Sequence, residues 1–113
     1  MTTSEIKLKI TVDENQLPHK IEWEAPDAKE GSICKSMMLA LWDEKENNTM
    51  RIDLWTKEMP VDQMRVFVHQ TLIGIRASYL KATQDVEMGE SFQQFCDYFS
   101  DELKLGKAQR TKE

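Results

Sequence analysis

The chain has 113 residues, of which 40% are hydrophobic and 31% are charged, and these values are typical of one folded domain. Its formal net charge of −5 disfavours nucleic acids and anionic membrane surfaces as partners, because both attract cationic proteins. No basic segment followed by an apolar one opens the chain, and no apolar run is long enough to span a membrane, so we expect a cytoplasmic protein. Cys34 and Cys96 are too few for a disulfide framework, and we expect both to be buried free thiols.

Apolar and polar residues alternate through the first half of the chain, which is the period of a strand with one buried face. The alternation predicts four strands, at residues 6–12, 19–25, 33–43 and 49–56. Between the second and third strands, residues 26–31 contain a proline and a glycine and are expected to form a polar loop. The other connections are short turns, so the sequence predicts a four-stranded antiparallel meander.

At Pro60 the apolar period changes to threes and fours, and proline suits the first turn of a helix. The first predicted helix runs to about residue 83, with the apolar stripe Val61, Met64, Val68, Leu72, Ile75 and Tyr79. The second begins after a capping Asp85 and ends at Gly106, with the stripe Met88, Phe92, Phe95, Phe99 and Leu103. We expect both helices to pack on one face of the sheet, giving a single α+β domain at residues 1–105 and a short, basic, frayed tail at 106–113.

Clusters of the residue types that catalysis or metal binding requires do not occur in this sequence. The two cysteines and two histidines lie in separate segments, whereas a structural zinc site needs four grouped ligands. The acidic turn at residues 43–46 lacks the glycine of a calcium loop and has Lys45 where such a loop has a carboxylate. His69 has no assignable catalytic partner and is expected at the surface or boundary of its helix. We therefore expect a protein that has no catalytic residues, no metal site and no cofactor.

The third predicted strand is apolar on both of its faces, and these faces carry Met37, Leu39 and Leu41 on one side and Met38, Ala40 and Trp42 on the other. Two adjacent helices can cover only one face of a small sheet, so the second face needs another cover. We predict that the second face binds a partner protein or a second copy of the same chain. The alternative is that the chain covers this face itself, with the loop at 26–31 or the end of the second helix.

A four-residue turn at residues 45–48 predicts which residues lie opposite each other on the second face. It pairs Trp42 with Arg51, Ala40 with Asp53, and Met38 with Trp55. These pairs offer a cation–π contact and a sulfur–aromatic contact, formed by residue types that are enriched at protein interfaces. The predicted partner-binding residues are therefore Met38, Trp42, Arg51, Asp53 and Trp55. A change of one residue in the length of the turn would exchange the two faces.

Two segments resemble the signature region of the gliding-motility-associated GldC family: residues 38–43, MLALWD, and residues 51–64, RIDLWTKEMPVDQM. The residues at 4–7 and at 95–96 are compatible with the same family. This resemblance implies a small bacterial protein without a secretion signal that assists surface gliding and is neither a motor nor an enzyme. It implies no catalytic or ligand-binding residues.

Together these features favour a cytoplasmic accessory protein of gliding motility that acts through protein–protein contacts. An alternative is a chaperone for unfolded or export-bound proteins, because a meander followed by two helices also resembles the plan of the export chaperone SecB. A small-molecule carrier is a third possibility, but the sequence shows no group of polar residues suited to a ligand.

Overall fold

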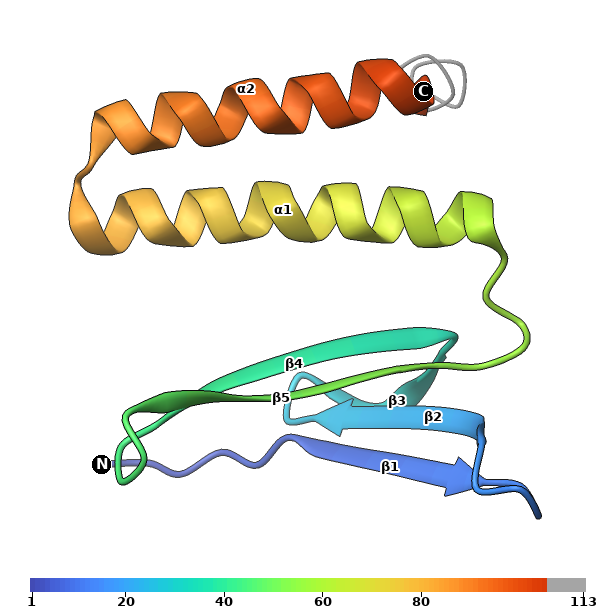
Figure 1. The fold of residues 1–113 in the computed structure, drawn as a ribbon. Coiled ribbons are helices and arrows are strands. Elements are labelled where there is room, and N and C mark those ends of the chain that lie inside the picture. The colour runs from blue at the N-terminus through green and yellow to red at the C-terminus, as the bar shows by residue number, and fades with distance from the viewer. Residues whose placement is uncertain (106–113) are drawn as a thin grey trace. The chain divides into compact units, whose positions relative to one another are not determined.

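The computed structural model describes residues 1–105, which form five strands followed by two helices (Figure 1). The strands are β1 (Lys7–Val12), β2 (Pro18–Ala25), β3 (Ala28–Cys34), β4 (Ser36–Asp43) and β5 (Asn48–Trp55), and the helices are α1 (Val61–Thr83) and α2 (Val86–Leu103). Contacts within the chain divide it into two compact units, one containing the strands and ending at Pro60, the other beginning at Val61 and containing the helices. The predicted α+β class is confirmed. The single domain and the packing of the helices on one sheet face stay predictions.

The strands form two antiparallel sheets, which corrects the predicted single meander of four strands. One sheet has the order β1-β2-β3, and the other contains β4 and β5. In the central strand β2, Ile21 pairs with Ile10 on one side and with Cys34 on the other, and its side chain is fully buried. Ile21 therefore lies at the centre of the small core of the three-stranded sheet.

Residues 26–31 do not form the predicted loop. Ala25 pairs with Ala28, so Pro26 and Asp27 alone make the turn and the rest of this segment belongs to β3. Gly31 has a φ of 71° inside β3, where the pairing with β2 shifts its register. A Cβ at this position would lie 2.6 Å from the carbonyl oxygen of Trp23, so the glycine permits an irregular strand rather than ending one. The segment that we considered as a cover for β4 and β5 is therefore a strand paired with β2 rather than a loop.

The predicted strand at residues 33–43 is divided at Lys35. Before it, the chain pairs with β2, and from Ser36 onward it pairs with β5. The carbonyl of Lys35 accepts a hydrogen bond from the N–H of Thr56 at 2.9 Å, and the Ser36 hydroxyl donates to the carbonyl of Leu54 at 3.2 Å. These bonds hold together the end of the two-stranded β4–β5 ribbon that is farther from its turn.

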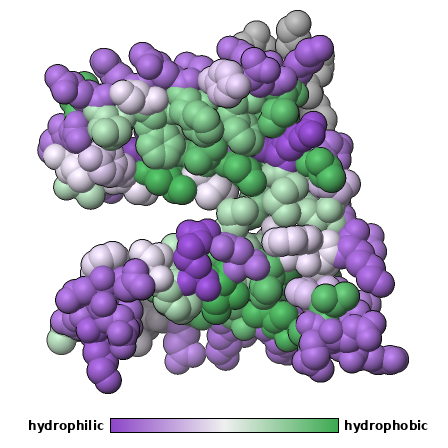
Figure 2. All heavy atoms as spheres, viewed as in Figure 1, coloured by the Kyte–Doolittle hydropathy of each residue, from purple (hydrophilic) through white to green (hydrophobic). Residues whose placement is uncertain are grey.

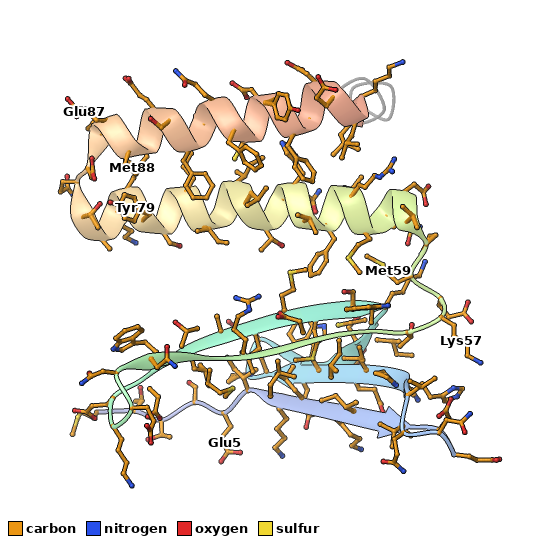
Figure 3. The ribbon with its side chains drawn as sticks, viewed as in Figure 1. Glu5, Lys57, Met59, Tyr79, Glu87 and Met88 are labelled. Carbon is orange, nitrogen blue, oxygen red and sulfur yellow. The ribbon has the colours of Figure 1, made fainter. Side chains whose placement is uncertain are left out.

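In the helical unit, Gln84 and Asp85 connect the two helices. The carboxylate of Asp85 accepts hydrogen bonds from the N–H of Met88 at 3.1 Å and from the hydroxyl of Tyr79 at 2.8 Å. Figure 3 labels Tyr79 on α1 and Met88 on α2, near this connection. The predicted role of Asp85 as a helix cap is thus confirmed. Close packing follows at Gly89, where an added Cβ would clash with the side chain of Leu80.

The predicted apolar stripes coincide only in part with the packed faces of the helices. In α2, Cys96 is fully buried, whereas Met88 and Phe95 from the predicted stripe are exposed. In α1, Val61 and Ile75 are likewise exposed. The packed side of α1 includes three residues outside the predicted stripe: His69, Arg76 and Leu80. Apolar residues extend around most of α1, so their spacing could not single out the face that meets α2.

His69 is buried, whereas the sequence predicted a position at the surface or boundary of its helix. Its Nε2 lies 3.1 Å from the carbonyl oxygen of Cys96, so this nitrogen carries the proton that is donated. The ring also stacks on Phe99 with 6.0 Å between centroids. Helix α2 ends at Leu103 because Lys104 adopts the left-handed conformation, with a φ of 58°. The predicted end at Gly106 and the tail at 106–113 lie outside the described residues.

Candidate protein-binding face

The alternation of side chains along β4 and β5 gives the ribbon two distinct faces. We call one of them the leucine face, which comprises Met37, Leu39, Leu41, Met50, Ile52 and Leu54. We call the other the tryptophan face, which comprises Ser36, Met38, Ala40, Trp42, Thr49, Arg51, Asp53 and Trp55. All five predicted partner-binding residues lie on the tryptophan face.

Both faces of the ribbon expose large apolar side chains. On the tryptophan face, Trp42 is 69% exposed and Trp55 is 59% exposed, and on the leucine face Leu41 is 49% exposed. Figure 2 shows apolar side chains at the surface of both units. Within residues 1–105, the buried apolar side chains are Ile21, Met37, Cys96 and Leu105. The ribbon therefore contributes only Met37 to this set, although both of its faces carry large apolar side chains.

The structure corrects the predicted pairs across the ribbon. Residues 44–47 form the turn, and the pair that closes it is Asp43 with Asn48. Asp43 determines this position, because its side chain accepts the N–H of Glu46 at 2.7 Å and its carbonyl accepts the N–H of Asn47 at 2.9 Å. Asn47 has a positive φ of 49°, which asparagine tolerates well. The turn thus begins one residue earlier than predicted. The closing pair moves by one residue on each strand, so each residue of β4 pairs with a residue two positions earlier in β5 than predicted. A shift of two residues leaves every side chain on its predicted face.

In the observed register, Trp42 pairs with Thr49 and Trp55 pairs with Ser36. These two pairs lie at opposite ends of the tryptophan face. Six residues of β4 separate Ser36 from Trp42, which corresponds to about 20 Å along the strand. Each tryptophan therefore has a small residue beside it, and the two tryptophans occupy diagonally opposite corners. They do not form the single cluster that the predicted pairing implied.

The middle of the tryptophan face contains an ion pair rather than the predicted cation–π and sulfur–aromatic contacts. Ala40 is the residue opposite Arg51, and Met38 is opposite Asp53. Arg51 donates from Nε and Nη2 to the two carboxylate oxygens of Asp53, at 2.9 and 2.7 Å. The hydrogen bonds that Arg51 donates to Asp53 raise the pKa of its guanidinium, which stays charged. The ion pair leaves this face with one charge of each sign and no net charge.

The described part of the chain also bears on metal binding, membrane insertion and small-molecule binding. Residues 1–105 contain no group of three histidine, cysteine or acidic residues placed to hold a metal ion. Neither α1 nor α2 is long and apolar enough to cross a membrane. A hollow of about 300 Å³ lies beside one end of the ribbon, lined by Leu17, Pro18, Asp53, Leu54, Trp55, Thr56 and Lys57.

Comparison with known families supplies the biological context. A family model described as gliding motility-associated protein GldC-like matches residues 18–105. The chain belongs to the GldC-like family. The match includes the whole tryptophan face of this GldC-like chain and both of its helices. The predicted resemblance is confirmed, and the chain is a member of a gliding-motility-associated family. No curated protein and no solved structure matches it.

Sequence reasoning missed two members of the tryptophan face, Ser36 and Thr49. Their signal was present in the alternation, because each lies an even number of residues from a predicted member on its own strand. Small polar residues are seldom anchors of an interface, so their residue types gave no separate signal. Ser36 and Thr49 matter because each is a small residue that pairs with a tryptophan and leaves space beside it. The partner-binding role of the whole face stays a prediction.

Proposed function

We propose that this chain is a non-enzymatic, cytoplasmic accessory protein of bacterial gliding motility that acts through protein–protein contacts at the tryptophan face. Membership of the GldC-like family supports the link to motility. One observation carries the proposed contact. Among the described strands β4 and β5 pair only with each other, and the ribbon exposes apolar side chains on both faces.

The physical reason is that apolar side chains left in contact with water are unfavourable. The ribbon therefore gains stability when another protein covers the apolar side chains that it exposes. Trp42 and Trp55 are suitable anchors, because tryptophan contributes large contact area at interfaces and is frequent among the residues that dominate binding energy. The Arg51–Asp53 pair adds polar groups that can fix the orientation of a partner.

The proposal is tested by complementation in a gliding bacterium that lacks its own member of this family. The variants Trp42→Ser and Trp55→Ser remove the two anchors without changing charge. Tyr98→Ser is the matched control, because Tyr98 lies on α2 and is 60% exposed, close to the 59% of Trp55. We expect the control to restore gliding and the double tryptophan variant to fail at an unchanged protein level. Normal gliding with the double variant would contradict the proposal.

A chaperone role is the second candidate, and the apolar side chains exposed on both faces of the ribbon favour it. A chaperone should suppress the aggregation of several unrelated unfolded proteins, and the double tryptophan variant should lose this effect. An accessory protein should instead crosslink to one specific partner through a photoreactive group placed at position 42. Suppression of aggregation without a specific crosslink would favour the chaperone.

A further inference from the structure

We infer that the partner on the tryptophan face is a second copy of this chain, joined to the first in a two-fold symmetric dimer. This inference rests on the proposed role of the tryptophan face as a contact surface. Three properties of the face support it: the placement of its large and small residues, the order of its charges, and its area.

The large and small residues are arranged so that the face fits itself. Consider two ribbons packed face to face, with the two-fold axis between them and perpendicular to the strands. Each end of β4 then lies over the opposite end of β4 in the other copy, and the same holds for β5. In the observed register, Trp42 faces the partner's Ser36, and Trp55 faces the partner's Thr49. Both tryptophans of each copy therefore enter a space beside a small residue.

The residues in the middle of the face fit under the same operation. Ala40 faces the partner's Met38, which again places a small residue against a large one. Arg51 faces the partner's Asp53, and Asp53 faces the partner's Arg51. The four charges alternate in sign around the axis, so each guanidinium can bind a carboxylate in its own chain and one across the interface. The net charge of −5 opposes self-association in general, but the two copies meet through faces without net charge.

The area of the face is sufficient for a small specific interface, which needs about 600 Å² on each partner. A whole tryptophan side chain offers up to about 250 Å². With Trp42 69% and Trp55 59% exposed, the two tryptophans supply about half of the required area. The other six residues of the tryptophan face cover the space between these corners and supply the rest. A foreign partner would have to provide two pockets about 20 Å apart with a charge pair between them, whereas a second copy has this arrangement already.

Charge exchange tests the dimer directly. Arg51→Asp gives a face with two acidic residues, and Asp53→Arg gives a face with two basic residues. Under the two-fold axis each single variant places like charges opposite one another, so we expect each to be monomeric by sedimentation velocity. An equimolar mixture should form a heterodimer, because every acidic residue then faces a basic one. The double variant Arg51→Asp/Asp53→Arg restores the alternation and should form homodimers like the wild type.

The wild type should sediment at twice the chain mass of 13.2 kDa, and Trp42→Ser should raise the dimer Kd by at least about 30-fold. Tyr98→Ser should leave the Kd unchanged. Misfolding of the single charge variants cannot imitate the expected result, since the same two chains must associate when mixed. A monomeric wild type at its highest soluble concentration overturns the inference, as does a mixture that stays monomeric. A monomeric wild type combined with failed gliding of the tryptophan variants would leave the proposed function standing, with a foreign protein on this face.

Discussion

Replacing Gly89 with alanine tests how closely α1 and α2 approach each other. Gly89 is buried in the first turn of α2, and a Cβ there would clash with Cδ2 of Leu80 and lie 2.9 and 3.1 Å from its Cγ and Cδ1. Gly74 in α1 provides the matched control, because a Cβ at that position would meet no heavy atom within 4 Å. The same substitution therefore adds the same methyl group to a filled site and to an open one.

The two sites predict opposite signs for the change in unfolding free energy. In an open helical site, alanine stabilises by up to about 1 kcal/mol relative to glycine. Overpacking in a filled site costs about 1 to 3 kcal/mol. The three atoms nearest the added methyl all belong to the Leu80 side chain, so either Leu80 must change its rotamer or α2 must move away. Moving α2 away would stretch the bond of 2.9 Å from Arg76 Nε to the carbonyl of Gly89. We expect Gly89→Ala to destabilise the chain by about 1 to 2 kcal/mol and Gly74→Ala to stabilise it.

Urea unfolding followed by far-UV circular dichroism measures both values, because the helices dominate that signal. A double-mutant cycle with Leu80→Ala identifies the cause, since the cost of Gly89→Ala should fall once the clashing side chain is removed. Equal stabilisation by the two glycine substitutions would refute the close approach of the helices at Gly89.

Three further predictions concern ionisable and reactive groups. The hydrogen bond from the Met88 N–H lowers the pKa of Asp85 in the folded chain. Asp85 therefore stabilises the fold above its unfolded pKa, and this contribution is lost as the pH falls through the folded pKa. Urea titrations at several pH values should show that Asp85→Asn loses less unfolding free energy on acidification than the wild type does. His69→Leu should cost about 0.5 to 1.5 kcal/mol in urea unfolding because it removes the hydrogen bond from the His69 ring to the Cys96 carbonyl, and His69→Gln should cost less. Burial raises the pKa of both thiols, but Cys96 is fully buried and Cys34 only partly, so intact-mass analysis should show iodoacetamide labelling Cys34 first in the folded protein.

Local signals in the sequence predicted the starts of the helices better than their packed faces. Pro60 and Asp85 act on the backbone next to them, so the starts of both helices could be predicted from the residue types alone. The packed faces depend on contacts between helices, such as that between Leu80 and Gly89. His69 shows the same limit, because the carbonyl that its ring binds lies 27 residues farther along the chain.

The strand β3 was not predicted, because Pro26 before it and Gly31 within it are residue types typical of a loop. Pro26 begins the turn, but Gly31 lies within the strand, where its positive φ accommodates the shift in register against β2. Nothing in the neighbouring residues distinguishes a glycine that ends a strand from one that bends it. The pairing with β2 decides the outcome, and that pairing lies outside the local pattern.

The register of the ribbon shows how a small error in prediction changes the functional interpretation. Alternation identified the residues that share the tryptophan face. The predicted pairing was wrong by two residues, and an error of two residues leaves the faces unchanged. The predicted register would have placed Trp55 opposite Met38 and Trp42 opposite Arg51, as one anchor cluster for any apolar partner. The hydrogen bonds of Asp43 fix the turn at residues 44–47, one residue earlier than predicted. In the resulting register the tryptophans lie at opposite corners of the face, each beside a small residue. A face with two separated anchors and a central ion pair suits a partner as long as the ribbon itself, and a second ribbon meets that requirement.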